Sequence, residues 1–125
     1  EDFDWARDQG FTVMQAEELW HRSATPLIEQ ARAALCDGPV YLSFDIDSLD
    51  PGFAPGTGTP EIGGANSFQA QQVVRELSGV NLVGADLVEV SPPFDAAGGT
   101  AWLGVSIIFE IMCVLAEAIA ARRDG

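Results

Sequence analysis

Residues 40–64, VYLSFDIDSLDPGFAPGTGTPEIGG, decide how the rest of this 125-residue chain is interpreted. The stretch opens with an apolar run, residues 40–44, and this pattern predicts a buried β-strand. Asp45, Asp47 and Asp50 follow at once, and a loop made mostly of Pro, Gly and Thr comes next. The sequence therefore predicts a strand that ends in a group of carboxylates.

Asp45 and Asp47 are two residues apart, and side chains at this spacing on an extended chain point the same way. Two neighbouring carboxylates repel each other unless a cation lies between them. Carboxylate oxygens suit hard divalent ions such as magnesium, calcium or manganese. The spacing alone leaves two interpretations open, a metal site or acidic side chains that cap the following loop. Asp50 precedes a proline, and we expect it to shape the turn through backbone hydrogen bonds.

Strand and helix patterns alternate along the chain, which predicts an α/β fold with a parallel sheet. We expect strands at residues 11–14, 40–44 and 80–88, and helices at residues 3–8, 16–22, 25–35, 66–77 and 100–121. Thr25 is the expected N-cap of one helix, and Asn66 forms a capping box with Gln69 at the start of another.

Ligands of parallel α/β sheets bind beyond the carboxyl ends of the strands. Asp45 and Asp47 follow one predicted strand, and Glu89 follows the next. Because consecutive strands are often neighbours, we expect these three carboxylates to face one crevice. Asp86 lies within the second strand, where we expect a buried residue with a structural role.

The final predicted helix, residues 100–121, is long and apolar on most sides, as a membrane-spanning helix would be. Glu110 lies in its middle and Glu117 near its end, and a charge at the centre of a bilayer is costly. We therefore expect a buried helix packed on the sheet and no membrane partner.

Composition narrows the classes of function. The chain has 6 basic and 19 acidic residues, a net charge of −13, which argues against nucleic acid or an anionic membrane as a partner. Cys36 and Cys113 stand apart in apolar segments, which indicates reduced core residues of a cytoplasmic protein. His21 is the only histidine, and we expect it to lie on the surface or in packing rather than to bind metal.

Three segments, SFDIDSLDP at residues 43–51, PGTGTPE at 55–61 and GADLVEVSPPFD at 84–95, resemble the ureohydrolases, the arginase and agmatinase family. The resemblance covers most of the chain and implies the three-layer α/β/α sandwich of the arginase type, with residues 1–125 as the C-terminal part of one domain. Ureohydrolases cut a small guanidino compound to urea and an amine, using two Mn²⁺ ions per active site, and they form trimers or hexamers. Glu61 is typical of agmatinase-like members, so the resemblance favours a substrate of the agmatine or guanidinobutyrate type.

The resemblance also implies roles for individual residues. Asp45 matches a ligand that bridges the two manganese ions, and Asp47 matches a ligand of one of them. Glu89 matches the carboxylate that pairs with the substrate guanidinium, where two parallel hydrogen bonds would fix its orientation. Thr59 matches a position near the guanidinium. The implied catalytic residues are therefore Asp45, Asp47 and Glu89.

Two further metal-binding motifs of the ureohydrolases, Gly-Gly-Asp-His and Asp-Ala-His-x-Asp, do not occur in these 125 residues. The sequence also begins without Met. We therefore expect the chain to be part of a longer protein, to carry about half of the metal site and to be inactive alone.

Three alternatives remain at the level of sequence. A phosphatase of the haloacid-dehalogenase type also places Asp-x-Asp after a strand, but it requires a downstream Lys, and the chain has none. A calcium-binding EF-hand requires helices on both sides of its loop, whereas an apolar strand precedes Asp45 and Pro51 interrupts the loop. The third alternative is an inactive ureohydrolase relative that acts as a scaffold.

Overall fold

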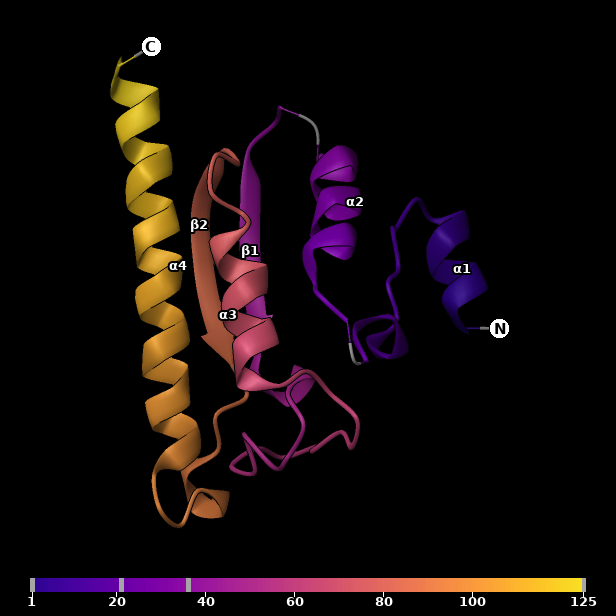
Figure 1. Cartoon of the computed structure of the whole chain (residues 1–125), viewed down its shortest axis with the longest axis vertical. Helices are drawn as coiled ribbons and strands as arrows, with labels where there is room; N and C mark the ends of the chain where they lie inside the picture. The colour runs from indigo at the N-terminus through magenta and orange to yellow at the C-terminus, as the bar shows by residue number, and fades with distance from the viewer. Residues whose placement is uncertain (1, 21, 36, 125) are drawn as a thin grey trace.

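The computed structural model describes residues 2–20, 22–35 and 37–124. The predictions for His21 and Cys36 concern residues that lie outside the described ones. From α2 (Thr25–Leu35) onwards, α-helices and strands alternate along the chain, as predicted for an α/β fold (Figure 1). The main elements are α1 (Asp2–Asp8), α2 (Thr25–Leu35), β1 (Val40–Asp45), α3 (Ser67–Arg75), β2 (Leu82–Val88) and α4 (Gly99–Asp124). Short 3₁₀ helices cover η1 (Ala16–Leu19), η2 (Ile46–Ser48) and η3 (Pro92–Phe94).

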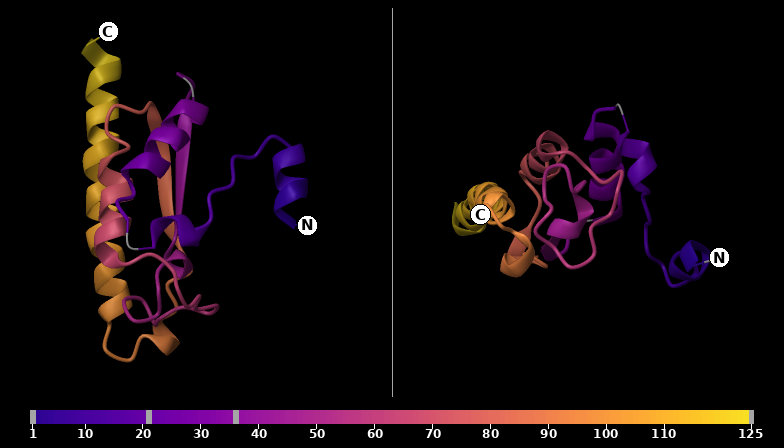
Figure 2. Two further views of the ribbon diagram at one scale, coloured as in Figure 1. Left: turned by 45° about the vertical axis from the view of Figure 1, so that its right-hand side comes forward. Right: turned by 90° about the horizontal axis from the view of Figure 1, so that it is seen from below.

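β1 and β2 form a parallel pair, with Val40 opposite Leu82 at one end and Asp45 opposite Val88 at the other. The predicted strand at residues 11–14 is wrong, because the sheet of the described residues contains β1 and β2 alone. A strand needs a neighbour to receive its backbone hydrogen bonds. Residues 11–15 instead run away from the sheet towards α1, which stands apart from the other helices (Figures 1 and 2).

The two faces of the sheet differ in exposure. On one face Val40, Phe44 and Leu82 belong to the hydrophobic core, which α3 and α4 complete. On the other face Tyr41 and Asp86 are exposed. Among the described residues, the helices therefore shield one side of the sheet.

α4 packs against β2 and α3 through a buried row that includes Ile107, Ile111 and Val114. Two acidic residues of α4, Glu110 and Glu117, have partners that are distant in sequence. Glu110 forms a salt bridge with Arg75 of α3, and Glu117 accepts a hydrogen bond from Ser78. The Arg75 guanidinium lowers the pKa of Glu110 below its usual value. These two acidic side chains are thus directed to α3 and to the turn that follows it.

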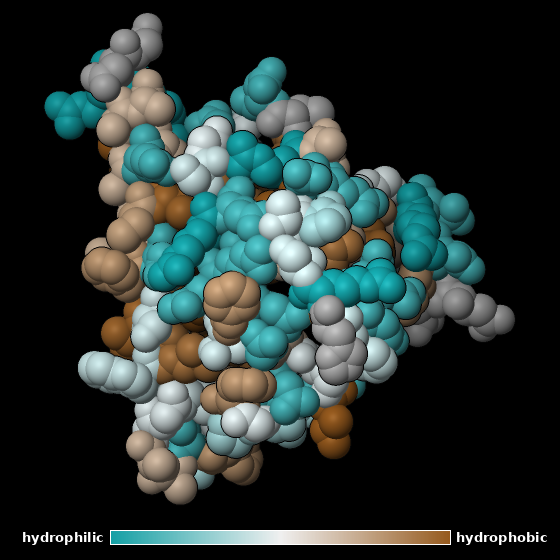
Figure 3. Space-filling view, in the orientation of Figure 1, coloured by the Kyte–Doolittle hydropathy of each residue, from teal (hydrophilic) through white to brown (hydrophobic). Residues whose placement is uncertain are grey.

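The predicted packing of α4 on the sheet is confirmed, but the outer side of the helix is exposed, so its predicted burial is only partly confirmed. Trp102 is 72% exposed and Phe109 is 62% exposed, and apolar side chains line the α4 side of the molecule in Figure 3. Cys113 also lies on this exposed side, which makes its assignment to the core wrong. By length and composition, Gly99–Arg123 could cross a membrane, and 28% of its most apolar window is buried within the described chain. Core helices of soluble proteins have the same length and composition, and the absence of a membrane partner stays a prediction.

The helix starts follow the sequence in one case and depart from it in another. At α3 the capping box is confirmed, because Asn66 Oδ1 accepts from Gln69 N at 2.8 Å and Gln69 Oε1 accepts from Asn66 N at 3.0 Å. At α2 the predicted N-cap is wrong, since Thr25 is already helical. The Thr25 hydroxyl instead donates to Glu76 Oε1 at 2.8 Å and so joins α2 to the end of α3.

Candidate active site

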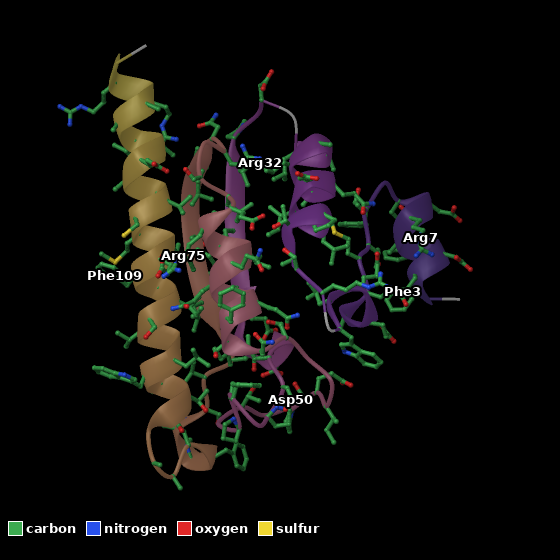
Figure 4. All side chains as sticks on the ribbon, in the orientation of Figure 1. Phe3, Arg7, Arg32, Asp50, Arg75 and Phe109 are labelled. Carbon is green, nitrogen blue, oxygen red and sulfur yellow. The ribbon has the colours of Figure 1, made fainter. Side chains whose placement is uncertain are left out.

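The carboxyl ends of β1 and β2 meet at one edge of the sheet and bring the predicted site residues together. Asp45 is the last residue of β1 and lies opposite Val88, the last residue of β2. Glu89 follows Val88 directly. The prediction that Asp45 and Glu89 lie at the same edge of the sheet is therefore confirmed. That the carboxylates of Asp45, Asp47 and Glu89 face one crevice stays a prediction. Figure 4 shows this end of the sheet, with Asp50 labelled in the loop beyond it.

Asp45 and Asp47 are held together by a turn rather than by an extended strand. β1 ends at Asp45, and the chain turns at once into η2. Asp45 caps this turn, because its Oδ1 accepts a hydrogen bond from the Asp47 backbone N at 2.9 Å. Ile46 lies between them, fully buried in the core. The prediction that the two residues alternate along an extended chain is wrong, but a buried apolar residue still fixes both carboxylates in one short turn.

The carboxylate of Asp47 offers an oxygen atom without a partner. Its Oδ2 accepts a hydrogen bond from the hydroxyl of Thr59. Its Oδ1 is buried and has no hydrogen-bond partner among the described residues. A buried carboxylate oxygen without a partner is costly, and a bound cation removes that cost. The pair Asp45 and Asp47 therefore fits a hard metal ion.

The described residues supply only part of a metal site. Within residues 2–20, 22–35 and 37–124, no group of three or more His, Cys, Asp or Glu side chains is arranged to hold a metal. Asp45 and Asp47 are thus a pair that requires ligands from elsewhere. Thr59, predicted to lie near a substrate guanidinium, contacts Asp47 in this structure, and its role towards substrate stays a prediction.

Glu89 has an unusual backbone. Its φ is 66°, the one positive φ of a non-glycine residue in the part of the chain that the structure describes. The left-handed region costs an ordinary L-residue about 1–2 kcal/mol. Such conformations persist where the surrounding structure fixes them, and they concentrate at functional sites. The side chain of Glu89 is exposed at the sheet edge and is available to a ligand.

The loop of residues 51–64 returns to the end of β1 through Asp50. The Asp50 carboxylate accepts from the backbone N of Gly63 and of Gly52, each at 2.8 Å. These two bonds, Gly63 first, lower the pKa of Asp50 below its usual value. The prediction that Asp50 shapes the turn is confirmed. A second contact of this loop, in which Trp20 Nε1 donates to the Gly63 carbonyl at 2.7 Å, has no signal in the sequence.

Gly64 permits the closest approach in this loop. A Cβ at Gly64 would lie 2.7 Å from backbone atoms of Ser48, Leu49 and Asp50. We expect Gly64→Ala to lower the free energy of unfolding by about 1–3 kcal/mol, because rigid backbone must move to admit the methyl group. Urea denaturation of the full-length gene product measures this change. Gly38→Ala is the matched control, since a Cβ there meets nothing within 4 Å, and equal losses for the two variants would contradict the prediction.

Asp86 ties β1 to β2 on the exposed face of the sheet. Its carboxylate accepts hydrogen bonds from Ser43 Oγ at 2.7 Å and from the Tyr41 hydroxyl at 2.8 Å. The bond from Ser43, and then the bond from Tyr41, lower the pKa of Asp86. The predicted structural role of Asp86 is confirmed, whereas its predicted burial is wrong.

A family profile and two relatives show which proteins this chain is similar to. The Arginase family profile matches residues 1–114. The chain is 56% identical over 115 residues to a guanidinobutyrase of Pseudomonas aeruginosa, covering 92% of this chain and 36% of that protein. It is 53% identical over 113 residues to a mitochondrial agmatinase of Gallus gallus, covering 90% of this chain and 33% of the relative.

A solved structure supports the same relationship. Proclavaminate amidino hydrolase from Streptomyces clavuligerus superposes with a TM-score of 0.89 at 37% identity, covering 94% of this chain and 39% of that one. The chain thus spans about a third of the length of the relatives it matches. The predicted arginase-type fold class is confirmed, and the phosphatase and EF-hand alternatives are not favoured. The chain belongs to the arginase family.

Proposed function

We propose that the full-length gene product is a manganese-dependent ureohydrolase that cuts a guanidino compound to urea and an amine. The observation that carries the proposal is the meeting of Asp45, Asp47 and Glu89 at one sheet edge in a chain of the arginase family. Relatives named guanidinobutyrase and agmatinase support a substrate of the guanidinobutyrate or agmatine type. By the resemblance to ureohydrolases we also expect a homotrimer or homohexamer.

In this proposal Asp45 and Asp47 hold two Mn²⁺ ions together with ligands from outside the described residues. The buried, unpartnered Oδ1 of Asp47 supports the assignment, as does the preference of manganese for carboxylate oxygen. Bound manganese would lower the pKa of a nearby water so that it can attack the guanidinium carbon at neutral pH. Thr59 donates to Oδ2 of Asp47 and so leaves Oδ1 for the metal.

Glu89 is the proposed partner of the substrate guanidinium. A carboxylate accepts two parallel hydrogen bonds from a planar guanidinium, which fixes the orientation of the reacting carbon as well as its charge. The chain carries 19 acidic and 6 basic residues, and this acidic surface would also attract a cationic substrate. Agmatine and guanidinobutyrate differ in the group at the far end of the molecule, an amine or a carboxylate, but they share the guanidinium, so Glu89 would bind both in the same way.

The test is urea release by the manganese-loaded full-length gene product from agmatine, guanidinobutyrate and arginine. We expect release from agmatine or guanidinobutyrate, loss of release after chelation, and recovery when Mn²⁺ is restored. If the protein releases urea from none of the three compounds, the result would contradict the proposal and favour an inactive scaffold. Recovery with Ca²⁺ but not Mn²⁺ would contradict the metal assignment.

A further inference from the structure

The loop that follows the Asp45–Asp47 turn is fixed to the segment after β2 by two consecutive residues, Gly56 and Thr57. Gly56 N donates to Thr100 Oγ1 at 2.8 Å, and the Gly56 carbonyl accepts from Ser91 N at 2.8 Å. Thr57 Oγ1 donates to the backbone carbonyl of Glu89 at 3.1 Å. These bonds hold the backbone at residues 89 and 91, on both sides of Val90.

Three of the residues that make these bonds, Gly56, Thr57 and Thr100, are buried. Thr57 is 3% exposed and Thr100 is fully buried. A Cβ at Gly56 would lie 2.5 Å from Asp95 Cβ, so the two loops are in direct contact there. By contrast Glu89 is exposed. A rigid, water-excluded contact therefore supports a side chain that faces solvent.

Thr100 is itself held in place at the start of α4. The Asp95 carboxylate accepts from Thr100 N at 3.0 Å and from Ala101 N at 2.8 Å. These backbone bonds, Ala101 first, lower the pKa of Asp95 below its usual value. The hydroxyl that receives the Gly56 N–H thus belongs to a fixed helix end, so the position of Thr57 is set from the core side.

The bond from Thr57 acts on a residue whose backbone is strained. Glu89 has a φ of 66°, and a conformation of this kind requires surrounding contacts to maintain it. The carbonyl that Thr57 holds belongs to Glu89 itself, and it is the ψ rotation of Glu89 that sets the direction of this carbonyl. Because φ and ψ decide where the Cα–Cβ bond points, the hydroxyl of Thr57 controls the direction in which the Glu89 side chain leaves the chain.

We propose that Thr57 is a positioning residue for the carboxylate of Glu89. Its buried hydroxyl holds the Glu89 carbonyl and thereby keeps Glu89 in the left-handed conformation from which its carboxylate meets the guanidinium. Thr57 touches neither substrate nor metal in this scheme. The inference rests on the proposed function for the identity of the ligand, but the conformational part stands on the geometry alone.

The test compares Thr57→Val with Thr57→Ser in the manganese-loaded full-length gene product. Val keeps the shape of Thr and removes the hydroxyl, whereas Ser keeps the hydroxyl and removes the methyl group. We expect Thr57→Val to raise KM for the guanidino substrate about threefold to tenfold, the usual range for one lost hydrogen bond. Manganese content should stay at the wild-type value, and Thr57→Ser should restore KM.

A crystal structure of Thr57→Val gives a second measurement that does not require activity. We expect φ of Glu89 to leave the left-handed region in this variant. An unchanged φ, a wild-type KM, an equal defect in the Ser variant, or a loss of folding or manganese would each overturn the inference. If wild-type protein releases no urea, the proposed function fails, and the crystal structure still decides whether Thr57 sets the Glu89 backbone.

Discussion

Asp47→Asn in the full-length gene product is expected to abolish urea release, with kcat/KM at least about 100-fold below wild type. Loss of a residue that merely supports a metal ligand costs about 10- to 100-fold, and loss of the ligand itself should cost no less. Asn keeps the size of Asp but carries no charge. One of its terminal atoms is an NH₂ group, which cannot bind a cation. The unpartnered Oδ1 of Asp47 is the proposed metal-binding atom, and the substitution removes its charge or replaces it with the NH₂ group.

The measurement is manganese content together with steady-state kinetics. We expect less bound manganese in Asp47→Asn as well as lower kcat/KM, because the change acts on the metal and not on the substrate. Asp37→Asn is the matched control, since Asp37 is exposed before β1, at the opposite end of the strand from the site. An Asp47→Asn protein with full manganese content and full activity would rule out Asp47 as a metal ligand.

The sequence predicted the site well where a topological rule or a local motif applied. Consecutive parallel strands place their carboxyl ends together, and this rule alone brought Asp45 and Glu89 to one edge. The capping box of Asn66 and the turn around Asp50 are local patterns, complete within a few residues, and both are confirmed. Local motifs of this kind can be predicted because the residues that interact lie within a few positions of each other in the sequence.

The sequence failed where the partner lies far along the chain. Thr57 and Glu89 are 32 residues apart, and Trp20 and Gly63 are 43 residues apart, so no local sequence pattern predicts either contact. The left-handed backbone of Glu89 was likewise invisible, because glutamate does not favour that region and tertiary contacts impose it. The strand expected at residues 11–14 failed for a related reason, since a strand exists only when another segment pairs with it.

The exposed apolar side chains of α4 show the same limit on sequence reasoning. The apolar pattern predicts a buried helix packed on the sheet, and α4 does pack there, but its contacts with β2 and α3 use only one side. The partner of Glu110 cannot be found from the residues around it in sequence. Glu110 has no basic residue close by in sequence, yet Arg75 reaches it from α3. The exposure of each α4 side chain and the partner of each charged residue therefore depend on the elements packed against the helix, not on its own sequence.

Glu89→Gln is expected to reduce kcat/KM by about 10- to 100-fold while manganese content remains at the wild-type value. Hydrogen bonds to charged groups are worth about 1.5–3 kcal/mol, which corresponds to this range. Gln keeps the length of Glu, but it offers one acceptor oxygen in place of two and carries no charge, so it cannot form the paired bonds to a guanidinium. KM should rise because the substrate binds less tightly, and kcat should fall because the guanidinium is oriented less well for attack.

Glu29→Gln, on the exposed surface of α2, is the matched control and should leave both kinetic constants unchanged. Glu89→Gln and Asp47→Asn together separate the two halves of the site. The first should weaken substrate binding with metal retained, and the second should remove metal. Loss of manganese from Glu89→Gln would place Glu89 among the metal ligands and contradict its role at the guanidinium. Unchanged kinetics would show that another residue binds the guanidinium, and the left-handed backbone at Glu89 would then require a different explanation.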